Sequence, residues 1–292
     1  MLYQFARAAD GHMSEIGGIL DKFVITRDKN TSDIRSILDD LIDGLSLYHL
    51  WAKLGWKDIL NRYQRSLLGP LWLTLSMGVL IGALGFLYAS LFKMDLSTYL
   101  PFLTIGFILW QLVSGILLDG CNAFISAEGI IKQIKLPLSL HIYRLLWKNI
   151  LTLGHNSIVI IIVLIVFKMD VSFYTLYALI GILLLALNGF WVALLFGLLC
   201  ARYRDLNPTI SSLVQLSFFV TPIIWSPSLI PDRQFIVLYN PFYHFIECIR
   251  APILGTPVAM ETWLIVSFIT VIGWIIVIPL AAKMKRKLVY WL

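Results

Sequence analysis

The sequence predicts an all-α polytopic membrane protein with six transmembrane helices, an N-terminal amphipathic interface helix and short re-entrant outer helices before the last span. Hydrophobic residues make up 59% of the chain and charged residues 14%, whereas roughly a quarter of the residues in a soluble domain are charged. Six stretches of 19 to 26 residues contain no Asp, Glu, Lys or Arg: 68–92, 99–118, 149–167, 174–199, 207–225 and 262–282. Each can cross a hydrocarbon core of about 30 Å as a helix, the form in which a lipid-exposed backbone pairs its own polar groups.

The distribution of basic residues predicts the orientation. If both termini are cytoplasmic, 19 of the 23 Lys and Arg residues lie on the cytoplasmic side, in segments 1–67, 119–148, 201–206 and 283–292. Cytoplasmic loops of membrane proteins carry such an excess, and the reverse topology would place it outside. The net charge of +6 is therefore attributed to topology and to contact with anionic lipid headgroups, and no nucleic-acid partner is expected.

Three segments are predicted along the chain: a polar cytoplasmic extension (1–47), the interface helix (48–67) and a six-span transmembrane domain (68–292). In the extension, the side chains of residues 31–33 can cap a helix. The apolar stripe of that helix would be formed by Ile34, Ile37, Leu38, Leu41 and Ile42. The helix could dock on a partner or on the membrane; a weakly ordered extension is the alternative.

The interface helix is predicted from tryptophans and aliphatic residues on one side of segment 48–67 and basic residues around the remainder. Helices of this kind lie in the headgroup layer of a membrane. The basic residues are Lys53, Lys57, Arg62 and Arg65. Such a cluster could attract the phosphate or pyrophosphate of a lipid carrier, and plain membrane anchoring is the alternative.

Segment 119–148 is the only long charged segment between two spans on the predicted cytoplasmic side. Glu128 and Lys132 lie four residues apart, in the order that favours an ion pair on a helix. Pro137 ends the short helix that they begin. The segment can lie at the membrane surface and present a charged face to a soluble partner; an ordinary solvated loop is the alternative.

The outer segment 226–261 is rich in proline and contains apolar runs that are too short to cross a bilayer. Short broken helices that dip into the outer leaflet, buried against the spans, are therefore expected there. Glu247 and Arg250 can pair with each other or line a wet vestibule. The candidate outer gate consists of Pro222, Pro227, Asn240, Pro241, Glu247 and Arg250.

Aromatic residues within the predicted spans are candidates for a channel lining that stacks on sugar rings. They are Trp72, Phe86, Tyr88, Trp110, Phe190, Trp191 and Trp225. Aromatic residues in spans also serve as packing residues or as interfacial anchors, and this is the alternative.

The motifs of several chemistries are absent from the sequence. There is no GxxxxGK[ST] motif, and the five histidines and three cysteines lack the spacing of metal ligands. No charged residue lies in the middle of a span, where proton- or ion-coupled carriers place one. We therefore expect no metal, no cofactor and no catalysis on this chain, and energy supplied by a partner ATPase.

Three stretches carry a resemblance to a known family. They are residues 61–72, residues 122–138 with Ile131-Lys132 and Leu136-Pro137, and residues 240–255, which begin Asn240-Pro241-Phe242-Tyr243 and include Glu247 and Arg250. They resemble the start of the first span, the segment with the coupling helix and the second outer gate region in the permease subunit of type-2 ABC exporters for O-antigen or capsular polysaccharide. Arg204 and Asp205 precede the fifth span, as in that family, and the similarity covers residues 48–290.

The resemblance implies a homodimer in the bacterial cytoplasmic (inner) membrane, seated on two nucleotide-binding ABC subunits that hold ATP and Mg. Lipid-linked polysaccharide would pass through a channel between the two copies. The residues that would couple ATP hydrolysis to the channel are Glu128, Ile131, Lys132, Lys135 and Pro137. The alternatives are a type-2 exporter of teichoic acid, drugs or small lipids, and a lipid-linked glycosyltransferase, for which the sequence lacks a suitable pair of carboxylates.

Overall fold

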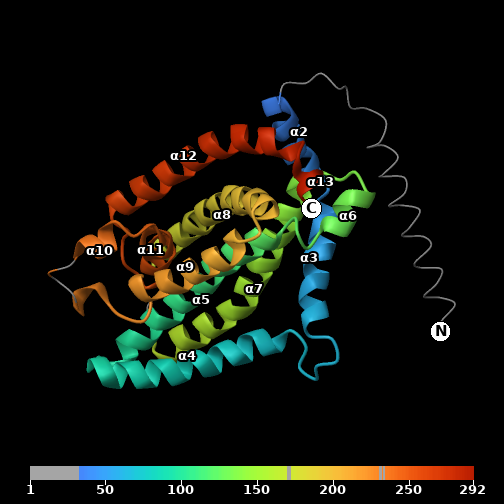
Figure 1. The fold of residues 1–292 in the computed structure, drawn as a ribbon. Helices are drawn as coiled ribbons and strands as arrows, with labels where there is room; N and C mark the ends of the chain where they lie inside the picture. Colours follow the sequence, from blue (N-terminus) through green and yellow to red (C-terminus); the bar gives the residue numbers. More distant parts are fainter. Residues whose placement is uncertain (1–32, 170–171, 230–231, 233) are drawn as a thin grey trace.

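The structure is a computed structural model that describes residues 33–169, 172–229, 232 and 234–292. The described residues form helices and connecting segments, without strands (Figure 1). In chain order the helices are α2 (Asp33–Ser46), α3 (Tyr48–Arg62), α4 (Leu71–Phe92), α5 (Leu96–Asn122), α6 (Glu128–Gln133), α7 (Ser139–Val166), α8 (Tyr177–Arg202), α9 (Leu206–Val220), α10 (Gln234–Leu238), α11 (Pro241–Ile253), α12 (Met260–Lys285) and α13 (Leu288–Trp291). Two 3-10 turns lie at Phe173–Leu176 and Pro227–Leu229.

Five helices in the described part of the chain are long and apolar enough to cross a membrane: α4, α5, α7, α8 and α12. The fifth predicted span, 207–225, is shorter than expected, because α9 has 15 residues and is therefore only about 22 Å long. Thr221 takes an extended conformation (ψ 136°), as is usual for a residue that precedes proline. The helix consequently ends before Pro222, and Trp225 lies outside any helix, contrary to the prediction that it lies in a span.

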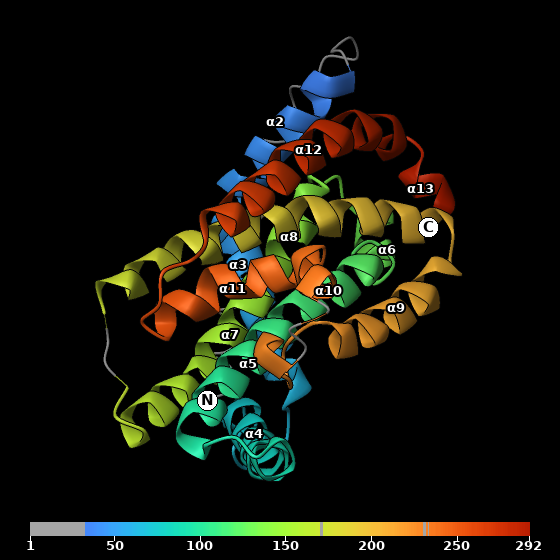
Figure 2. The same cartoon turned by 90° about the vertical axis from the view of Figure 1, so that its left-hand side faces the viewer.

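Helix α5 occupies the middle of the bundle, and α4 and α12 lie at opposite edges (Figures 1 and 2). In the apolar stretch of α5, 61% of the residues are buried, against 22% in α4 and in α12. The packing of α5 against α8 is especially close. A Cβ atom added to Gly120 would lie 2.8 Å from the Cα atom of Ala193, so this crossing needs glycine. The exposed faces of α4 and α12 are apolar, as expected for surfaces that contact lipid or a second copy.

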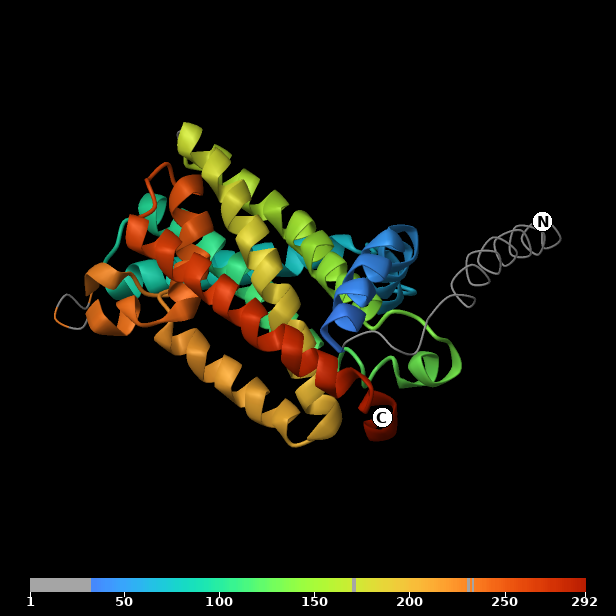
Figure 3. The same cartoon turned by 90° about the horizontal axis from the view of Figure 1, so that it is seen from above.

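The segments predicted to be cytoplasmic gather at one end of the bundle. Helices α2, α3, α6 and α13 lie there, and α10 and α11 lie at the opposite end (Figures 1 and 3). Helix α3 runs across the ends of the long helices (Figure 1). This is the orientation expected of a helix in the plane of a membrane surface.

Helix α3 is shorter than the predicted interface helix, because it ends at Arg62 rather than at residue 67. The chain then turns through two residues in the left-handed region, Arg65 (φ 66°) and Gly69 (φ 55°). The inner side of α3 packs against α7. Trp51 stacks on Tyr143 at 5.8 Å between ring centroids, and a Cβ atom on Gly55 would lie 3.0 Å from the carbonyl oxygen of Arg144.

The predicted helix in the extension is present as α2, and it docks on α7 and α12 of the same chain. Within the predicted apolar stripe, Ile37 is 2% exposed and Leu41 is partly buried, whereas Ile34, Leu38 and Ile42 are exposed. The stripe is therefore only partly used in this contact. The predicted cap residues Thr31 and Ser32 lie outside the described residues.

Candidate functional site

The predicted coupling residues lie in and around α6, at the end of the bundle that holds α2 and α3 (Figure 3). The side chains of Glu128 and Lys132 are both exposed and form an ion pair at 2.6 Å. The hydrogen bond from Lys132 lowers the pKa of the Glu128 carboxyl group below its usual value, so Glu128 is a carboxylate at neutral pH. Lys135 is also exposed. These side chains form a charged surface that a soluble partner can reach.

Two predicted coupling residues are not on that surface. Ile131 is partly buried against the core, and α6 contacts the C-terminal helix α13. Pro137 is buried at the start of α7. Both residues therefore connect the charged surface of α6 to the bundle, and neither offers an exposed contact.

A buried carboxylate that the sequence analysis did not single out joins α2 to the first residues of α7. Asp40 is 2% exposed. Its Oδ2 accepts a hydrogen bond from the Leu138 amide at 3.1 Å, and its Oδ1 accepts one from the Ser139 amide at 2.9 Å. Lys285, in the last turn of α12, lies 2.7 Å from Oδ2. Asp40 thus satisfies amide groups at the start of α7 that have no partner within the helix.

A second ion pair joins α3 to α7. Asp58 accepts two hydrogen bonds from Arg144, from Nε at 2.7 Å and from Nη2 at 2.5 Å. A bidentate arginine–carboxylate pair fixes the orientation of both groups. It therefore holds the candidate interface helix against α7 in a defined register.

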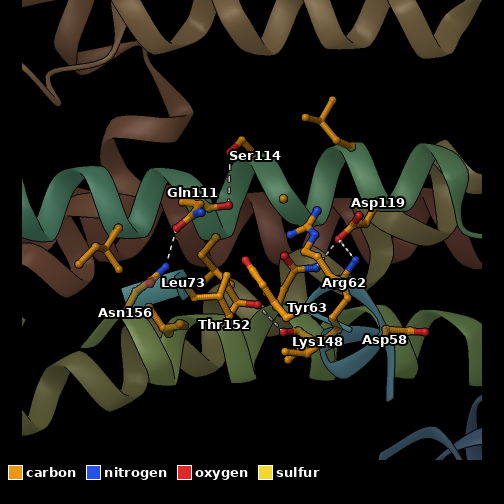
Figure 4. Close-up of a pocket in the computed structure, with 17 residues that line it drawn as sticks. Asp58, Arg62, Tyr63, Leu73, Gln111, Ser114, Asp119, Lys148, Thr152 and Asn156 are labelled. Carbon is orange, nitrogen blue, oxygen red and sulfur yellow. Dashed lines mark hydrogen bonds and ion pairs between the residues drawn. The ribbon is translucent and has the colours of Figure 1, made fainter. Parts of the chain in front are cut away.

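A polar pocket of about 410 Å³ lies where the end of α3 and the start of α4 meet α5 and α7 (Figure 4). Its polar lining residues are Asp58, Arg62, Tyr63, Gln111, Ser114, Asp119, Lys148, Asn149, Thr152 and Asn156. Asp119 binds Lys148 at 2.7 Å and accepts a hydrogen bond from Asn149 at 2.8 Å. Charged and amide groups are thus concentrated between helices that are otherwise apolar.

The structure separates the four basic residues that were predicted to bind a lipid phosphate. Arg62 is exposed and also lines the pocket. Lys53, Lys57 and Arg65 are exposed and are not among the residues that line it. Any phosphate contact by these three would take place at the surface.

At the opposite end of the bundle, three of the six candidate gate residues come together, because Glu247 and Pro222 both contact Arg250, which is 1% exposed. Its Nη2 lies 2.6 Å from the Glu247 carboxylate, and its Nη1 donates to the carbonyl oxygen of Pro222 at 2.7 Å. The guanidinium also lies 4.0 Å from the centroid of the Phe102 ring on α5. Of the two predicted possibilities, the structure thus shows pairing with Glu247, and this cluster attaches α11 to α5 and to the end of α9.

Asn240 and Pro241 begin α11. The Asn240 side chain accepts hydrogen bonds from the amides of Phe242 and Tyr243, as a helix N-cap does. It also donates to Thr221 Oγ1 at 3.0 Å. Pro241 stands in the first turn, where its missing N–H leaves no hydrogen bond unmade. Pro227 begins the 3-10 turn Pro227–Leu229.

Several aromatic channel candidates are packed inside this single chain. Trp110 and Phe190 are 7% and 5% exposed. Phe190 stacks on Trp274 at 5.6 Å, and the indole of Trp191 donates to Asn188 at 2.9 Å. Within one copy of the chain these residues therefore serve as packing residues, which was the alternative to a channel lining.

The remaining candidates lie nearer the surface. Trp72 and Phe86 are exposed on α4, and Tyr88 stacks on Phe92 at 5.6 Å. Trp225, outside the helices, donates from its indole to the carbonyl oxygen of Phe219 at 3.0 Å. Only an exposed residue such as Trp72 or Phe86 can line a passage between two copies without rearrangement of the chain.

Residues 49–254, which include α3 to α11, match the family described as ABC-2 type transporter. This match covers most of the chain. The chain belongs to the ABC-2 type transporter family. It is therefore a multi-pass membrane permease subunit and a non-catalytic component of a transporter that uses a separate ABC ATPase subunit.

Two curated relatives resemble this ABC-2 permease. Both are called O-antigen export system permease protein RfbA and come from Klebsiella pneumoniae. One is 26% identical over 250 residues, covering 82% of this chain and 94% of the relative. The other is 27% identical over 204 residues, covering 67% of this chain and 76% of the relative.

Sequence reasoning about the ABC-2 permease missed the residues that hold its segments together. Asp40 lies three residues after Ile37 and four before Gly44, on the buried face of α2. This spacing was a signal that one acidic residue faces the bundle. Nothing in the sequence indicated that its partners would be residues 138, 139 and 285.

Proposed function

We propose that this chain is the channel-forming subunit of an exporter that moves lipid-linked polysaccharide from the cytoplasmic side across the bacterial inner membrane. O-antigen is the favoured cargo and capsular polysaccharide the next. The observation that carries the proposal is the similarity to an O-antigen export permease over 94% of that relative's length. Export of a long polar polymer by this family needs a passage, and we place it between two copies of the chain.

In the proposed mechanism, ATP binding and hydrolysis on the partner subunits move the segment from Glu128 to Leu138. Three features support this role. The Glu128–Lys132 surface of α6 is exposed, α6 contacts α13, and the segment leads directly into α7 through the buried carboxylate of Asp40. A displacement of α6 is consequently passed to α7, α12 and α2 together.

At the outer end, we propose that α10 and α11 gate the passage. The Arg250 cluster supports this role because a few side-chain contacts connect α11 to Phe102 on α5 and to Pro222, two residues after the end of α9. Such contacts can be made and broken as a unit. In this proposal, cargo is released to the outer side when α11 moves away from α5.

A type-2 exporter of teichoic acid, drugs or small lipids would have the same architecture and is the alternative. Cargo would distinguish these proteins. A small-molecule exporter predicts a change in drug resistance on deletion, whereas a polysaccharide exporter predicts loss of a surface glycan. A lipid-linked glycosyltransferase is disfavoured, since the chain belongs to a family of non-catalytic transporter subunits.

The proposal is tested in a deletion strain of the source organism, complemented with this chain. We expect the strain to lose the surface polysaccharide and to accumulate the same glycan, attached to lipid, in its cytoplasmic membrane. Unchanged surface glycan in the deletion strain, together with altered susceptibility to drugs, would establish the alternative instead.

A further inference from the structure

The polar pocket of Figure 4 has an excess of positive charge at one end. Asp58 is already paired with Arg144, and Asp119 with Lys148. The side chain of Arg62 has neither an ion pair nor a hydrogen bond with any residue that the structure describes. Figure 4 shows its side chain reaching into the pocket toward the part of α5 between Ser114 and Asp119. After the pairs are formed, one guanidinium charge therefore remains without an anion.

The other end of the pocket is neutral and contains an unused acceptor. Asn156 is 1% exposed, and its amide nitrogen donates to Gln111 Oε1 at 2.6 Å. Its Oδ1 atom is buried and has no hydrogen-bond donor among the described residues. Leaving a buried acceptor without a partner is unfavourable, so this atom favours any molecule that brings a hydroxyl group to it.

The two ends are separated by the length of a small polar ligand. Lys148, at the charged end, and Asn156, at the neutral end, are eight residues apart on α7, a distance of about 12 Å along the helix. Thr152 lies between them on the same helix and also lines the pocket. The volume of about 410 Å³ is sufficient for a ligand of this length.

We infer that this pocket binds a phosphate ester that carries free hydroxyl groups. The phosphate lies at Arg62, which offers the planar donors that suit a phosphate. The hydroxyl groups lie toward Thr152 and Asn156, where one of them donates to the unused Oδ1 atom. The carboxylate of Asp119 does not exclude a phosphate, because Lys148 and Asn149 hold it.

Two sources could supply this chemistry. One is the glycerol phosphate headgroup of a membrane lipid, and this source does not depend on which cargo is exported. The other is the sugar–phosphate linkage of a lipid-linked glycan, and this source rests on the proposed export function. The charged end of the pocket, with Asp119 and Lys148, lies at the predicted cytoplasmic ends of spans 99–118 and 149–167, where either phosphate is expected.

The test uses the full chain in complex with its ATPase, reconstituted in nanodiscs of phosphatidylcholine. One preparation contains phosphatidylglycerol and the other a polyprenyl phosphosugar. The phosphate ester that stays with the complex after transfer to detergent is quantified by mass spectrometry. Arg62→Ala is compared with Arg65→Ala, which removes an exposed arginine three residues away that does not line the pocket.

We expect Arg62→Ala to lower the retained ligand about tenfold, since a charge-assisted hydrogen bond contributes about 1.5–3 kcal/mol and 1.4 kcal/mol corresponds to a factor of ten. Asn156→Leu should also lower it, and Thr152→Val serves in its place if that variant does not accumulate. Arg65→Ala should leave retention unchanged. Equal losses from the two arginine variants, or no ligand retained in either preparation, would overturn the inference.

The two preparations also identify the source. Retention of phosphatidylglycerol supports a resident membrane lipid, and retention of only the phosphosugar supports the end of the cargo. If the deletion strain kept its surface glycan, the proposed export function would fail, but the phosphatidylglycerol measurement would still decide whether the pocket is a phosphate-ester site.

Discussion

Asp40 and Lys285 form a buried ion pair, 2.7 Å between Oδ2 and Nζ, at the point where α2, α7 and α12 meet. The same carboxylate accepts hydrogen bonds from the amides of Leu138 and Ser139. Helix α7 directly follows the proposed coupling segment, which runs from Glu128 to Leu138. The Asp40 carboxylate therefore connects α2, α7 and α12 to the segment on which the ATPase is proposed to act. An N-terminal extension without an assigned role thereby becomes part of the proposed coupling machinery.

We expect Asp40→Ala to destabilise the chain by about 3–5 kcal/mol, because it leaves the Lys285 ammonium partly buried without its partner. Asp40→Asn should have a smaller effect, since the amide oxygen can still accept one backbone hydrogen bond. Thermal unfolding of the detergent-purified protein measures both. ATPase activity of the complex should become less dependent on cargo in each variant, relative to wild type.

Truncation provides the matched control for this prediction. Deletion of residues 1–32 leaves α2 complete and should preserve membrane abundance and export. Deletion of residues 1–47 removes α2 with Asp40 and should reduce both. Equal performance of the two truncations would contradict a role of α2 in the coupling of ATP hydrolysis to transport.

Charge reversal on α6 tests the proposed ATPase contact. The double variant Lys132→Glu with Lys135→Glu changes two exposed cations and should weaken recovery of the ATPase subunit with this chain, while membrane insertion is unchanged. Co-purification and surface glycan are the measurements. The control is Lys53→Glu with Lys57→Glu, which alters the same charge on α3. If both double variants lost the ATPase equally, the effect would be one of net charge.

The crossing of α5 and α8 should tolerate no side chain at Gly120. Gly120→Ala would bring Cβ to 2.8 Å from the Cα atom of Ala193, and overpacking of this kind costs about 1–3 kcal/mol. Gly82→Ala on α4 is the matched control, since a Cβ there meets no atom within 4 Å, and alanine in a helix is favoured by about 1 kcal/mol over glycine. The melting temperature should fall for the first variant and stay the same or rise for the second.

The long spans were predictable from the sequence because their signal is local. A stretch such as 262–282 carries no charge over enough residues to cross a bilayer, and it forms α12. The exception is the fifth span, where the charge-free stretch 207–225 contains a helix of only 15 residues. Pro222 is the sequence signal that ends this helix, because a proline disfavours a helical conformation at the residue before it, here Thr221.

The contacts between segments were not predictable from the sequence, because they join residues that are far apart along the chain. The Arg250–Glu247 pair has helical spacing and was foreseen as one possibility. The contact of Arg250 with Pro222 and the contact of Asp40 with Ser139 depend on how the helices pack. The same is true of the pocket, for which only Arg62 was identified in advance.

Arg250 is the residue on which the proposed outer gate is most directly tested. Arg250→Met keeps much of the side-chain length but leaves Glu247 and the carbonyl oxygen of Pro222 without their donor, and loss of one partner of a buried ion pair costs about 3–5 kcal/mol. We therefore expect α11 to separate from α5. The ring of Phe102 on α5 lies 4.0 Å from the guanidinium. A cysteine introduced at this position should consequently react faster with an impermeant maleimide added from outside. The control is the same cysteine in a chain with Glu261→Gln, which removes an exposed charge at the outer start of α12 that takes no part in the Arg250 contacts. Because the guanidinium bridges α11 to residue 222 as well as to Glu247, Arg250→Lys should restore only part of the protection. Equal labelling in chains with Arg250, Arg250→Met and Arg250→Lys, with membrane abundance preserved, would show that Arg250 stabilises the outer end without closing it.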